Sequence, residues 1–90
     1  MQWVIAYDIS SDRRRRRVTR RLEQVGFRRQ KSVFEGELKQ SLMQDLMQEL
    51  GSEIDPATDQ LTAWSMSGRA RGILHAGCPR AETQKDFHIL

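Results

Sequence analysis

The sequence predicts an α+β fold with the ferredoxin-like order βαββαβ, in which an antiparallel sheet carries two helices on one face. Two segments with the apolar spacing of helices alternate with short segments rich in bulky apolar side chains. No internal repeat or linker interrupts the 90 residues, a length that suits one small domain. We expect a single domain over residues 1–90, with a core over about 2–76 and a tail over 77–90.

The first expected element is a buried strand formed by the apolar run from Trp3 to Ile9, which Ser10 and Ser11 end. A helix should follow over about residues 12–25, with Ser10 or Ser11 as its N-cap and Gly26 at its end. Its buried stripe has the i, i+4, i+7 spacing of a helix face and consists of Val18, Leu22 and Val25.

Residues 27–38 are extended in character but exceed the usual length of one strand. We therefore expect two short strands with a bend at residues 30–32, or one strand with a bulge. A second helix should span residues 39–50 and end at Gly51. Its apolar stripe consists of Leu42, Met43, Leu46, Met47 and Leu50.

Residues 54–59 should form a turn, because they contain Pro56 and two aspartates. Strands are expected over residues 60–66 and 72–76. The apolar end of the chain, residues 86–90, and the sheet face that the helices leave bare together indicate a homodimer in which a C-terminal strand crosses to the partner. Deleting this end should then give monomers.

The charge of the chain is strongly asymmetric. Residues 12–31 carry ten Arg or Lys against Asp12 and Glu23, whereas the other 70 residues have a net charge of −5. A charged run is most simply a solvated helix face, but two acids cannot neutralise ten cations. The basic segment therefore predicts salt-sensitive, largely sequence-independent contact with nucleic-acid phosphates. Arg14, Arg17 and Arg20 are taken as examples of the contacting residues.

The same composition disfavours a membrane role. The basic helix has a narrow apolar face, no stretch approaches the roughly 20 apolar residues that span a bilayer, and no signal-peptide order is present. The single cysteine, Cys78, has no partner for an internal disulfide, which fits a reducing cytoplasm. We expect a cytoplasmic protein.

Asp8 is the candidate catalytic and metal-binding residue, because it places a carboxylate at the end of a strand beside the arginines. Phosphodiester hydrolysis needs a metal to stabilise charge and to generate hydroxide, and Mg²⁺ uses few carboxylates and several waters. The alternative role for Asp8 is to hydrogen-bond backbone groups in the turn before the helix. Ser10 could support a metal site through a water or simply cap the helix.

Other residues have ordinary structural explanations. The aromatic residues Trp3, Phe34 and Trp64 could stack bases but lie in apolar strands, which favours the core. The possible zinc ligands His75, Cys78 and His88 have no repeated ligand spacing.

Several of these segments resemble a known family, the Cas2 family of small CRISPR adaptation proteins. The similar segments are Tyr7-Asp8-Ile9-Ser10 with the basic helix after it, residues 30–38 (Gln-Lys-Ser-Val-Phe-Glu-Gly-Glu-Leu), and Ile54-Asp55-Pro56 with the strand that follows. The resemblance covers about residues 2–66. Lys39 departs from it, standing where relatives commonly have a Ser or Thr helix cap, so the second helix could start elsewhere. Residues 67–85 are also unlike the family.

The resemblance implies a ferredoxin-like homodimer that binds duplex DNA as a scaffold with the CRISPR integrase during spacer acquisition. It also implies metal-dependent endonuclease activity on RNA or DNA, conditional or dormant, with Asp8 of each protomer as ligand of Mg²⁺ or another divalent cation such as Mn²⁺. Single-stranded RNA is a possible partner besides duplex DNA. Two alternatives remain: a free-standing, toxin-like small ribonuclease, and a non-catalytic RNA-binding module.

Overall fold

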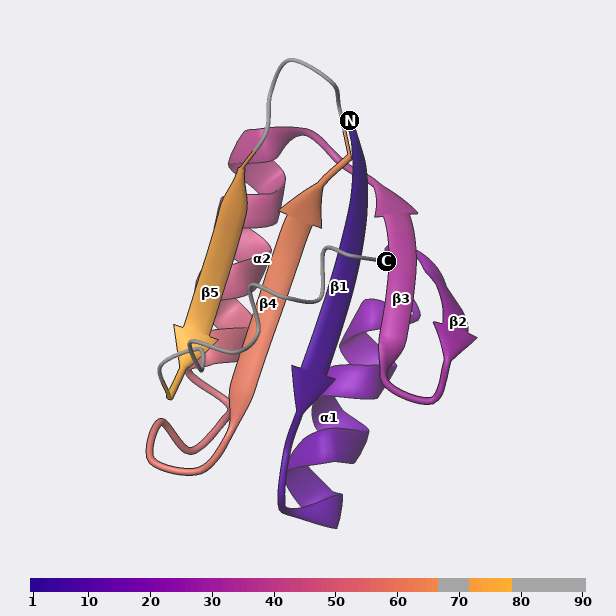
Figure 1. Cartoon of the computed structure of the whole chain (residues 1–90). Helices are drawn as coiled ribbons and strands as arrows, with labels where there is room; N and C mark the ends of the chain where they lie inside the picture. The colour runs from indigo at the N-terminus through magenta and orange to yellow at the C-terminus, as the bar shows by residue number, and fades with distance from the viewer. Residues whose placement is uncertain (67–71, 79–90) are drawn as a thin grey trace, which may run out of the picture.

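The computed structural model describes residues 1–66 and 72–78, which form a five-stranded antiparallel sheet with two helices on one face (Figure 1). The strand order is β2-β3-β1-β4-β5. The elements, in chain order, are β1 (Gln2–Asp8), α1 (Asp12–Leu22), β2 (Phe27–Gln30), β3 (Val33–Glu37), α2 (Gln40–Gly51), β4 (Gln60–Ser65) and β5 (Ile73–Gly77). The first six follow the predicted βαββαβ order, and β5 adds an edge strand beside β4.

Strand β1 lies at the centre of the sheet and alternates strictly. Trp3, Ile5 and Tyr7 are buried beneath the helices, whereas the residues between them are half-buried on the other face. The apolar run is thus covered most fully on one face, as expected in an antiparallel sheet. Because alternation continues to the end of the strand, Asp8 is exposed on the face away from the helices.

Helix α1 is shorter than the sequence predicted. It ends at Leu22, and residues 23–25 form turns in which the backbone amides of Val25 and Gly26 both bond to the carbonyl of Leu22. Gly26 is needed after these turns because an added Cβ would lie 2.2 Å from the carbonyl oxygen of Glu35. At the other end, Ser11 and not Ser10 is the N-cap, its hydroxyl accepting a hydrogen bond from the Arg14 amide.

The extended segment after α1 forms two strands, as predicted. Strands β2 and β3 are separated by Lys31 and Ser32, and their pairing shifts register between Arg28 and Gln30. All four residues of β2 are exposed, because it is the edge strand of the sheet. The resulting β2–β3 hairpin stands beside α1 (Figure 1).

Helix α2 begins at Gln40, one residue later than predicted. Met43, Leu46, Met47 and Leu50 are buried against the sheet. The inclusion of Leu42 in the apolar stripe was wrong, since its side chain is 49% exposed. Only one side of the helix meets the sheet, and Leu42 lies beyond that stripe.

The N-terminus of α2 offers a test of helix capping. Lys39 is the N-cap residue, with extended backbone (φ −66°, ψ 150°) and no side-chain cap bond. We expect Lys39→Ser to raise the free energy of unfolding by about 1 kcal/mol, because serine can accept a bond from a free amide of the first turn. Urea denaturation measures the change. Lys39→Ala removes the same charge without supplying a cap and should give little or none of the gain.

The end of the chain only partly meets the predictions. β4 begins at Gln60 as predicted and ends one residue early, and β5 is shifted by one residue. The two strands pair from Gln60↔Gly77 to Trp64↔Ile73. The predicted dimer-crossing strand at residues 86–90 lies outside the described residues. No helix in the described part of the chain is long and apolar enough to span a membrane.

Candidate nucleic-acid interface

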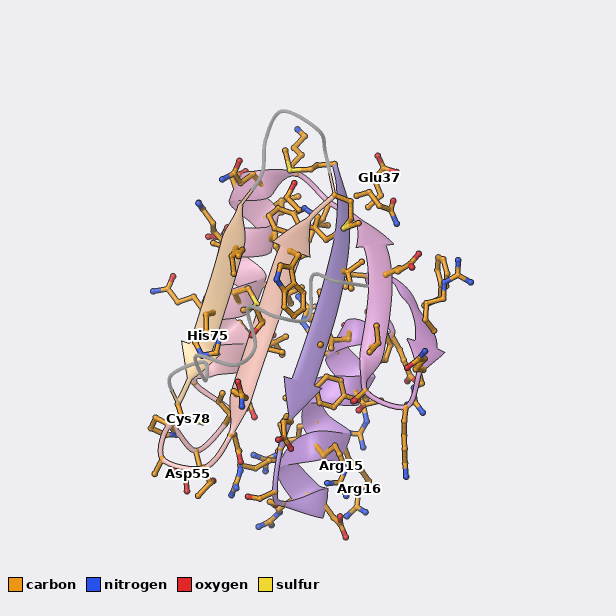
Figure 2. All side chains as sticks on the ribbon, viewed as in Figure 1. Arg15, Arg16, Glu37, Asp55, His75 and Cys78 are labelled. Atoms are coloured by element: carbon orange, nitrogen blue, oxygen red, sulfur yellow. The ribbon has the colours of Figure 1, made fainter. Side chains whose placement is uncertain are left out.

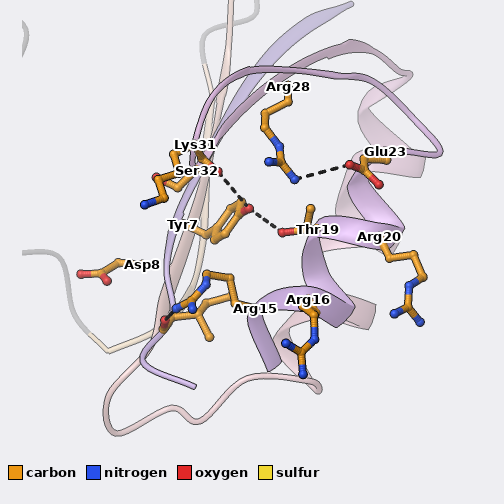
Figure 3. A pocket seen from close by; sticks show the side chains of 11 residues that line it. Tyr7, Asp8, Arg15, Arg16, Thr19, Arg20, Glu23, Arg28, Lys31 and Ser32 are labelled. Atoms are coloured by element: carbon orange, nitrogen blue, oxygen red, sulfur yellow. Dashed lines mark hydrogen bonds and ion pairs between the residues drawn. The ribbon is translucent and has the colours of Figure 1, made fainter. Parts of the chain in front are cut away.

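The site begins where β1 passes into α1. Asp8 is exposed and, among the residues that the structure describes, its carboxylate has no hydrogen-bond or ion-pair partner. Ile9 is buried and anchors the connection, and the Ile9 carbonyl accepts a 2.9 Å hydrogen bond from the guanidinium of Arg15. In Figure 3 the Asp8 side chain points away from Tyr7 and from the helix. The carboxylate is therefore free to meet a ligand or a second molecule.

Asp59, which the sequence reading treated only as a turn residue, holds this connection in place. Its side chain is fully buried and accepts hydrogen bonds from the backbone amides of Ser10 (3.1 Å) and Asp55 (2.9 Å). The guanidinium of Arg14 lies against it, with Nε 2.8 Å from a carboxylate oxygen. Burial by itself raises the pKa of Asp59, but the hydrogen bonds from Arg14, the two amides and Thr58 outweigh it and hold the pKa well below its ordinary value.

This arrangement bears on the alternative role of Asp8. The sequence left open that Asp8 hydrogen-bonds the backbone of the turn before α1, and in the structure Asp59 fills that role from another part of the chain. Ser10 likewise bonds to Asp59 and Thr58 instead of capping the helix. Nothing in the sequence distinguished Asp59 from Asp55, because only the fold brings residue 59 against the start of α1.

The arginines of α1 divide into two stripes. The paired stripe consists of Arg14, Arg17 and Arg21, whose guanidinium groups contact Asp59 (2.8 Å), Glu53 (3.4 Å) and Glu49 (2.8 Å) respectively. These acids come from α2 and the loop after it. The paired stripe therefore joins α1 to the rest of the fold, and two of the three arginines singled out from the sequence, Arg14 and Arg17, belong to it.

The second stripe consists of Arg13, Arg16 and Arg20. Among the described residues, these three side chains have no ion-pair partner, and all three are exposed. Their spacing of three and four residues places them along one side of the helix. Arg15 belongs to neither stripe and pairs with Asp12. Arg20 is the one residue of the original three whose charge is left without a partner.

An open groove of about 650 Å³ runs beside this unpaired stripe, between α1 and the β2–β3 hairpin (Figure 3). Its lining includes both Asp8 and Glu23. The lining cations are Arg15, Arg16, Arg20, Arg28 and Lys31. The lining residues therefore carry a net charge of +3. We call this feature the basic groove.

Charge is also unevenly placed along the molecule. Figure 2 shows Arg15 and Arg16 near the end of the sheet where Asp55 lies, with Glu37 near the opposite end. A smaller groove of about 290 Å³ lies along the paired stripe, and there Glu49 and Glu53 face three arginines. The basic groove, with two acids against five cations, is the stronger attractor of anions.

The described residues of one protomer do not make a metal site at Asp8. The described residues contain no group of three or more His, Cys, Asp or Glu side chains that could hold an ion. Asp8 offers the hard oxygen ligand that Mg²⁺ prefers, without a competing partner. The residues present thus fit a divalent cation only where a second molecule supplies further ligands.

The remaining sequence candidates have structural roles. Trp3 and Phe34 are fully buried in the core, as predicted, whereas Trp64, also assigned to the core, is half-buried and lies outside the buried cluster. His75 uses both ring nitrogens, one 2.8 Å from the hydroxyl of Thr62 and the other 2.6 Å from the carbonyl of Cys78. His88 lies outside the described residues.

Known proteins are similar to this chain over most of its length. The family model of CRISPR associated protein Cas2 matches residues 1–72. Two proteins from strains of Thermus thermophilus, both named CRISPR-associated endoribonuclease Cas2, are 37% identical over 83 residues, covering 88% of this chain and 88% of each relative.

Solved structures are similar as well. A hypothetical protein from Thermus thermophilus superposes with a TM-score of 0.70 at 34% identity, covering 74% of this chain and 82% of that one. Cas2 from Streptococcus pyogenes superposes with a TM-score of 0.68 at 26% identity, covering 74% and 87%. With its fold and its sequence both matched, this chain belongs to the CRISPR associated protein Cas2 family.

Proposed function

We propose that this protein acts in CRISPR spacer acquisition as a homodimeric scaffold, which binds duplex DNA through the basic groove and works with the CRISPR integrase. We further propose that it can cut RNA or DNA when a divalent cation is bound. Membership of the Cas2 family supports the first role, and the name of the Thermus relatives, CRISPR-associated endoribonuclease, supports the second.

One observation carries the proposal: three partnerless cations line the basic groove, and Asp8, which also lines it, has a partnerless carboxylate that points away from the helix. Asp8 has no structural role among the described residues, and Arg16, Arg20 and Lys31 have no acid to neutralise them. Charges that serve the fold are normally paired, as Arg14 is with Asp59. Cations left unpaired on one exposed surface favour an external anion as their partner.

Duplex binding follows from these cations. The arginines and Lys31 contact phosphates, which positions the nucleic acid without reading its sequence. Arginine suits this task because its planar fork matches the phosphate oxygens. The described strands carry no pair of exposed aromatic side chains on which bases could stack. This disfavours the alternative of an RNA-binding module.

For cleavage, the Asp8 carboxylates of two copies would hold Mg²⁺ or Mn²⁺, with water filling the remaining positions. The bound ion would stabilise charge on the phosphoryl group and generate hydroxide near neutral pH. The protein's own contribution is to hold the phosphodiester against the groove and to leave the Asp8 carboxylate without a partner of its own. Cleavage of single-stranded RNA with no response to duplex DNA would favour the toxin-like ribonuclease.

The two arginine stripes give a direct test of the binding surface. We expect Arg16→Gln/Arg20→Gln to weaken binding of a duplex, measured by fluorescence anisotropy, roughly tenfold at moderate salt. The slope of log affinity against log salt should fall by about 2, because each lost phosphate contact releases about one counterion fewer. Arg17→Gln/Arg21→Gln removes the same charge from the paired stripe and serves as the matched control.

The control variant Arg17→Gln/Arg21→Gln should lose much less affinity for the duplex and keep most of the salt dependence of binding. Glu53 and Glu49 already neutralise Arg17 and Arg21. Equal losses in the two double variants would mean that net charge alone governs binding. Unchanged binding in both would remove the basic groove from the proposal.

A further inference from the structure

The basic groove is a cleft with cations on two separate walls. Arg16 and Arg20 come from α1, whereas Arg28 and Lys31 come from the β2–β3 hairpin. Arg28 is held by Glu23 at 3.4 Å, and the other three have no ion-pair partner among the described residues. Two like-charged walls repel each other, and an anion placed between them relieves that repulsion.

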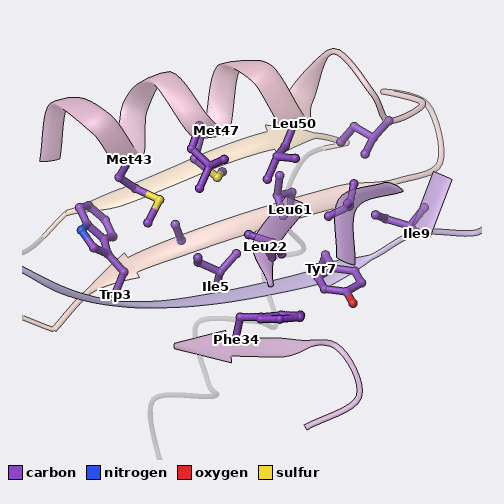
Figure 4. Packing of buried hydrophobic residues seen from close by; sticks show 14 residues of the cluster. Trp3, Ile5, Tyr7, Ile9, Leu22, Phe34, Met43, Met47, Leu50 and Leu61 are labelled. Atoms are coloured by element: carbon purple, nitrogen blue, oxygen red, sulfur yellow. The ribbon is translucent and has the colours of Figure 1, made fainter. Parts of the chain in front are cut away.

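The floor between these walls carries two hydroxyl groups. The hydroxyls of Tyr7 and Thr19 lie 2.6 Å apart, and Figure 3 shows them meeting between Arg28 and Arg16. The Tyr7 ring is fixed in the core beside Phe34, with ring centroids 6.2 Å apart (Figure 4). The position of the pair is therefore set by packing and not by the ligand.

The hydroxyl pair has a proton to spare. Two hydroxyls have two protons, and the bond between them uses one. The second has only the carbonyl of Lys31, 3.5 Å from the Tyr7 oxygen, which is at the outer limit of a hydrogen bond. Thr19 is half-buried and lines the groove, so this pair can donate to an anion in the cleft.

We propose that the cleft between α1 and the β2–β3 hairpin binds a phosphomonoester, with Arg16, Arg28 and Lys31 around it and the Tyr7–Thr19 hydroxyl pair beneath. This site rests on the proposed function, because it lies within the basic groove, but it assigns that groove a ligand distinct from the duplex backbone. The ligand is the terminal phosphate of a strand or a free nucleotide, which share this chemistry.

A phosphomonoester fits the cleft better than an internal phosphodiester does. It carries a charge of about −1.5 to −2 at neutral pH and three terminal oxygens, which can meet two walls and a floor together. It also ends a chain and can enter a cleft, whereas an internal phosphate continues in both directions. When water hydrolyses a phosphodiester, a P–O bond breaks and the water oxygen bonds to phosphorus. One product strand then ends in a phosphomonoester, and the departing oxygen takes up a proton.

The test compares two duplexes that differ only in a 5′-phosphate or a 5′-hydroxyl at each end. We expect wild-type protein to bind the phosphorylated duplex about tenfold more tightly. In Tyr7→Phe/Thr19→Val, which removes both hydroxyls and keeps the buried volume, the affinity ratio should fall close to one. Thr62→Val, which removes a hydroxyl from the other face of the sheet, should keep the wild-type ratio. Thermal unfolding of each variant confirms folding.

Two further measurements distinguish the terminal phosphate of a strand from a free nucleotide. A 3′-phosphate duplex tests the other strand end, and adenosine 5′-monophosphate is tested as a competitor against the phosphorylated duplex. An affinity ratio of one in wild type, with no competition by the nucleotide, overturns the phosphomonoester site and leaves duplex binding standing. Failure to bind even the hydroxyl-ended duplex would instead overturn the proposed function. If Tyr7→Phe/Thr19→Val still binds the phosphorylated duplex more tightly than the hydroxyl-ended one, the proposed role of the two hydroxyls is overturned.

Discussion

Replacing Asp8 by asparagine is expected to lower the rate of metal-dependent cleavage by roughly a hundredfold or more while nucleic-acid binding persists. A metal ion contributes several kcal/mol of charge stabilisation to phosphoryl transfer, and asparagine lacks the charge that holds it. The substitution should not disturb the fold, because the carboxylate has no partner among the described residues. The measurement is cleavage of single-stranded RNA and duplex DNA, with Mg²⁺ and with chelator, while binding is recorded in the same samples.

The matched control is Asp45→Asn, which changes an exposed carboxylate on α2, away from the basic groove. It should cleave like wild type. Metal-dependent cutting that persists undiminished in Asp8→Asn would exclude Asp8 as ligand. Tight binding without cutting in wild type would leave the scaffold role standing and would withdraw the nuclease proposal.

Replacing Asp59 by alanine is expected to lower the free energy of unfolding by about 3 kcal/mol, because it removes a buried, ion-paired acceptor. The amides of Ser10 and Asp55 lose their partner, and Arg14 loses its counter-ion. For a domain of this size the midpoint of thermal unfolding should fall by about 12–24 °C. Asp59→Asn keeps one acceptor oxygen and should lose less.

The pH dependence of stability gives a second readout of the same group. The pKa of folded Asp59 is lowered, so its stabilisation is present above the pKa of the unfolded chain, about 4, and declines as the pH falls further toward the folded value. The difference in stability between wild type and Asp59→Asn should therefore narrow from pH 5 to pH 2. A constant difference over this range would contradict an ionised, paired Asp59.

The same two aspartates show how far sequence reasoning reached at the site. Asp8 was found because it directly follows an apolar strand and precedes the arginine run, and both signals are local. Asp59 was missed because its importance depends on a contact with Arg14, 45 residues away in the chain. Arginine identity alone could not separate the paired stripe from the unpaired one, because the acids that divide them come from α2 and the loop after it.

Local patterns determined much of the fold. Apolar periodicity placed both helices and the strands, and their order gave the antiparallel sheet with helices on one face. The sequence prediction was wrong at the ends of elements and at the edge of a helix face. At these positions, contacts with neighbouring elements determine where a helix ends and which side chains are buried. Leu42 has helical spacing with the stripe but is exposed, and α1 stops at Leu22, before Gly26 packs against the backbone of Glu35.

By itself, the sequence determined a basic ferredoxin-like domain with a carboxylate at the end of its first strand. Charge composition and the spacing of apolar residues can both be read from residues that are close together in the sequence. Only the tertiary structure decided which of those charges are free. Ion pairing requires two groups within a few ångströms, and here the partners approach through packing of α1 against α2 and the loop before β4. Among the described residues, the unpaired groups that line the basic groove, Asp8 with Arg16, Arg20 and Lys31, are the part of the protein left to meet a ligand.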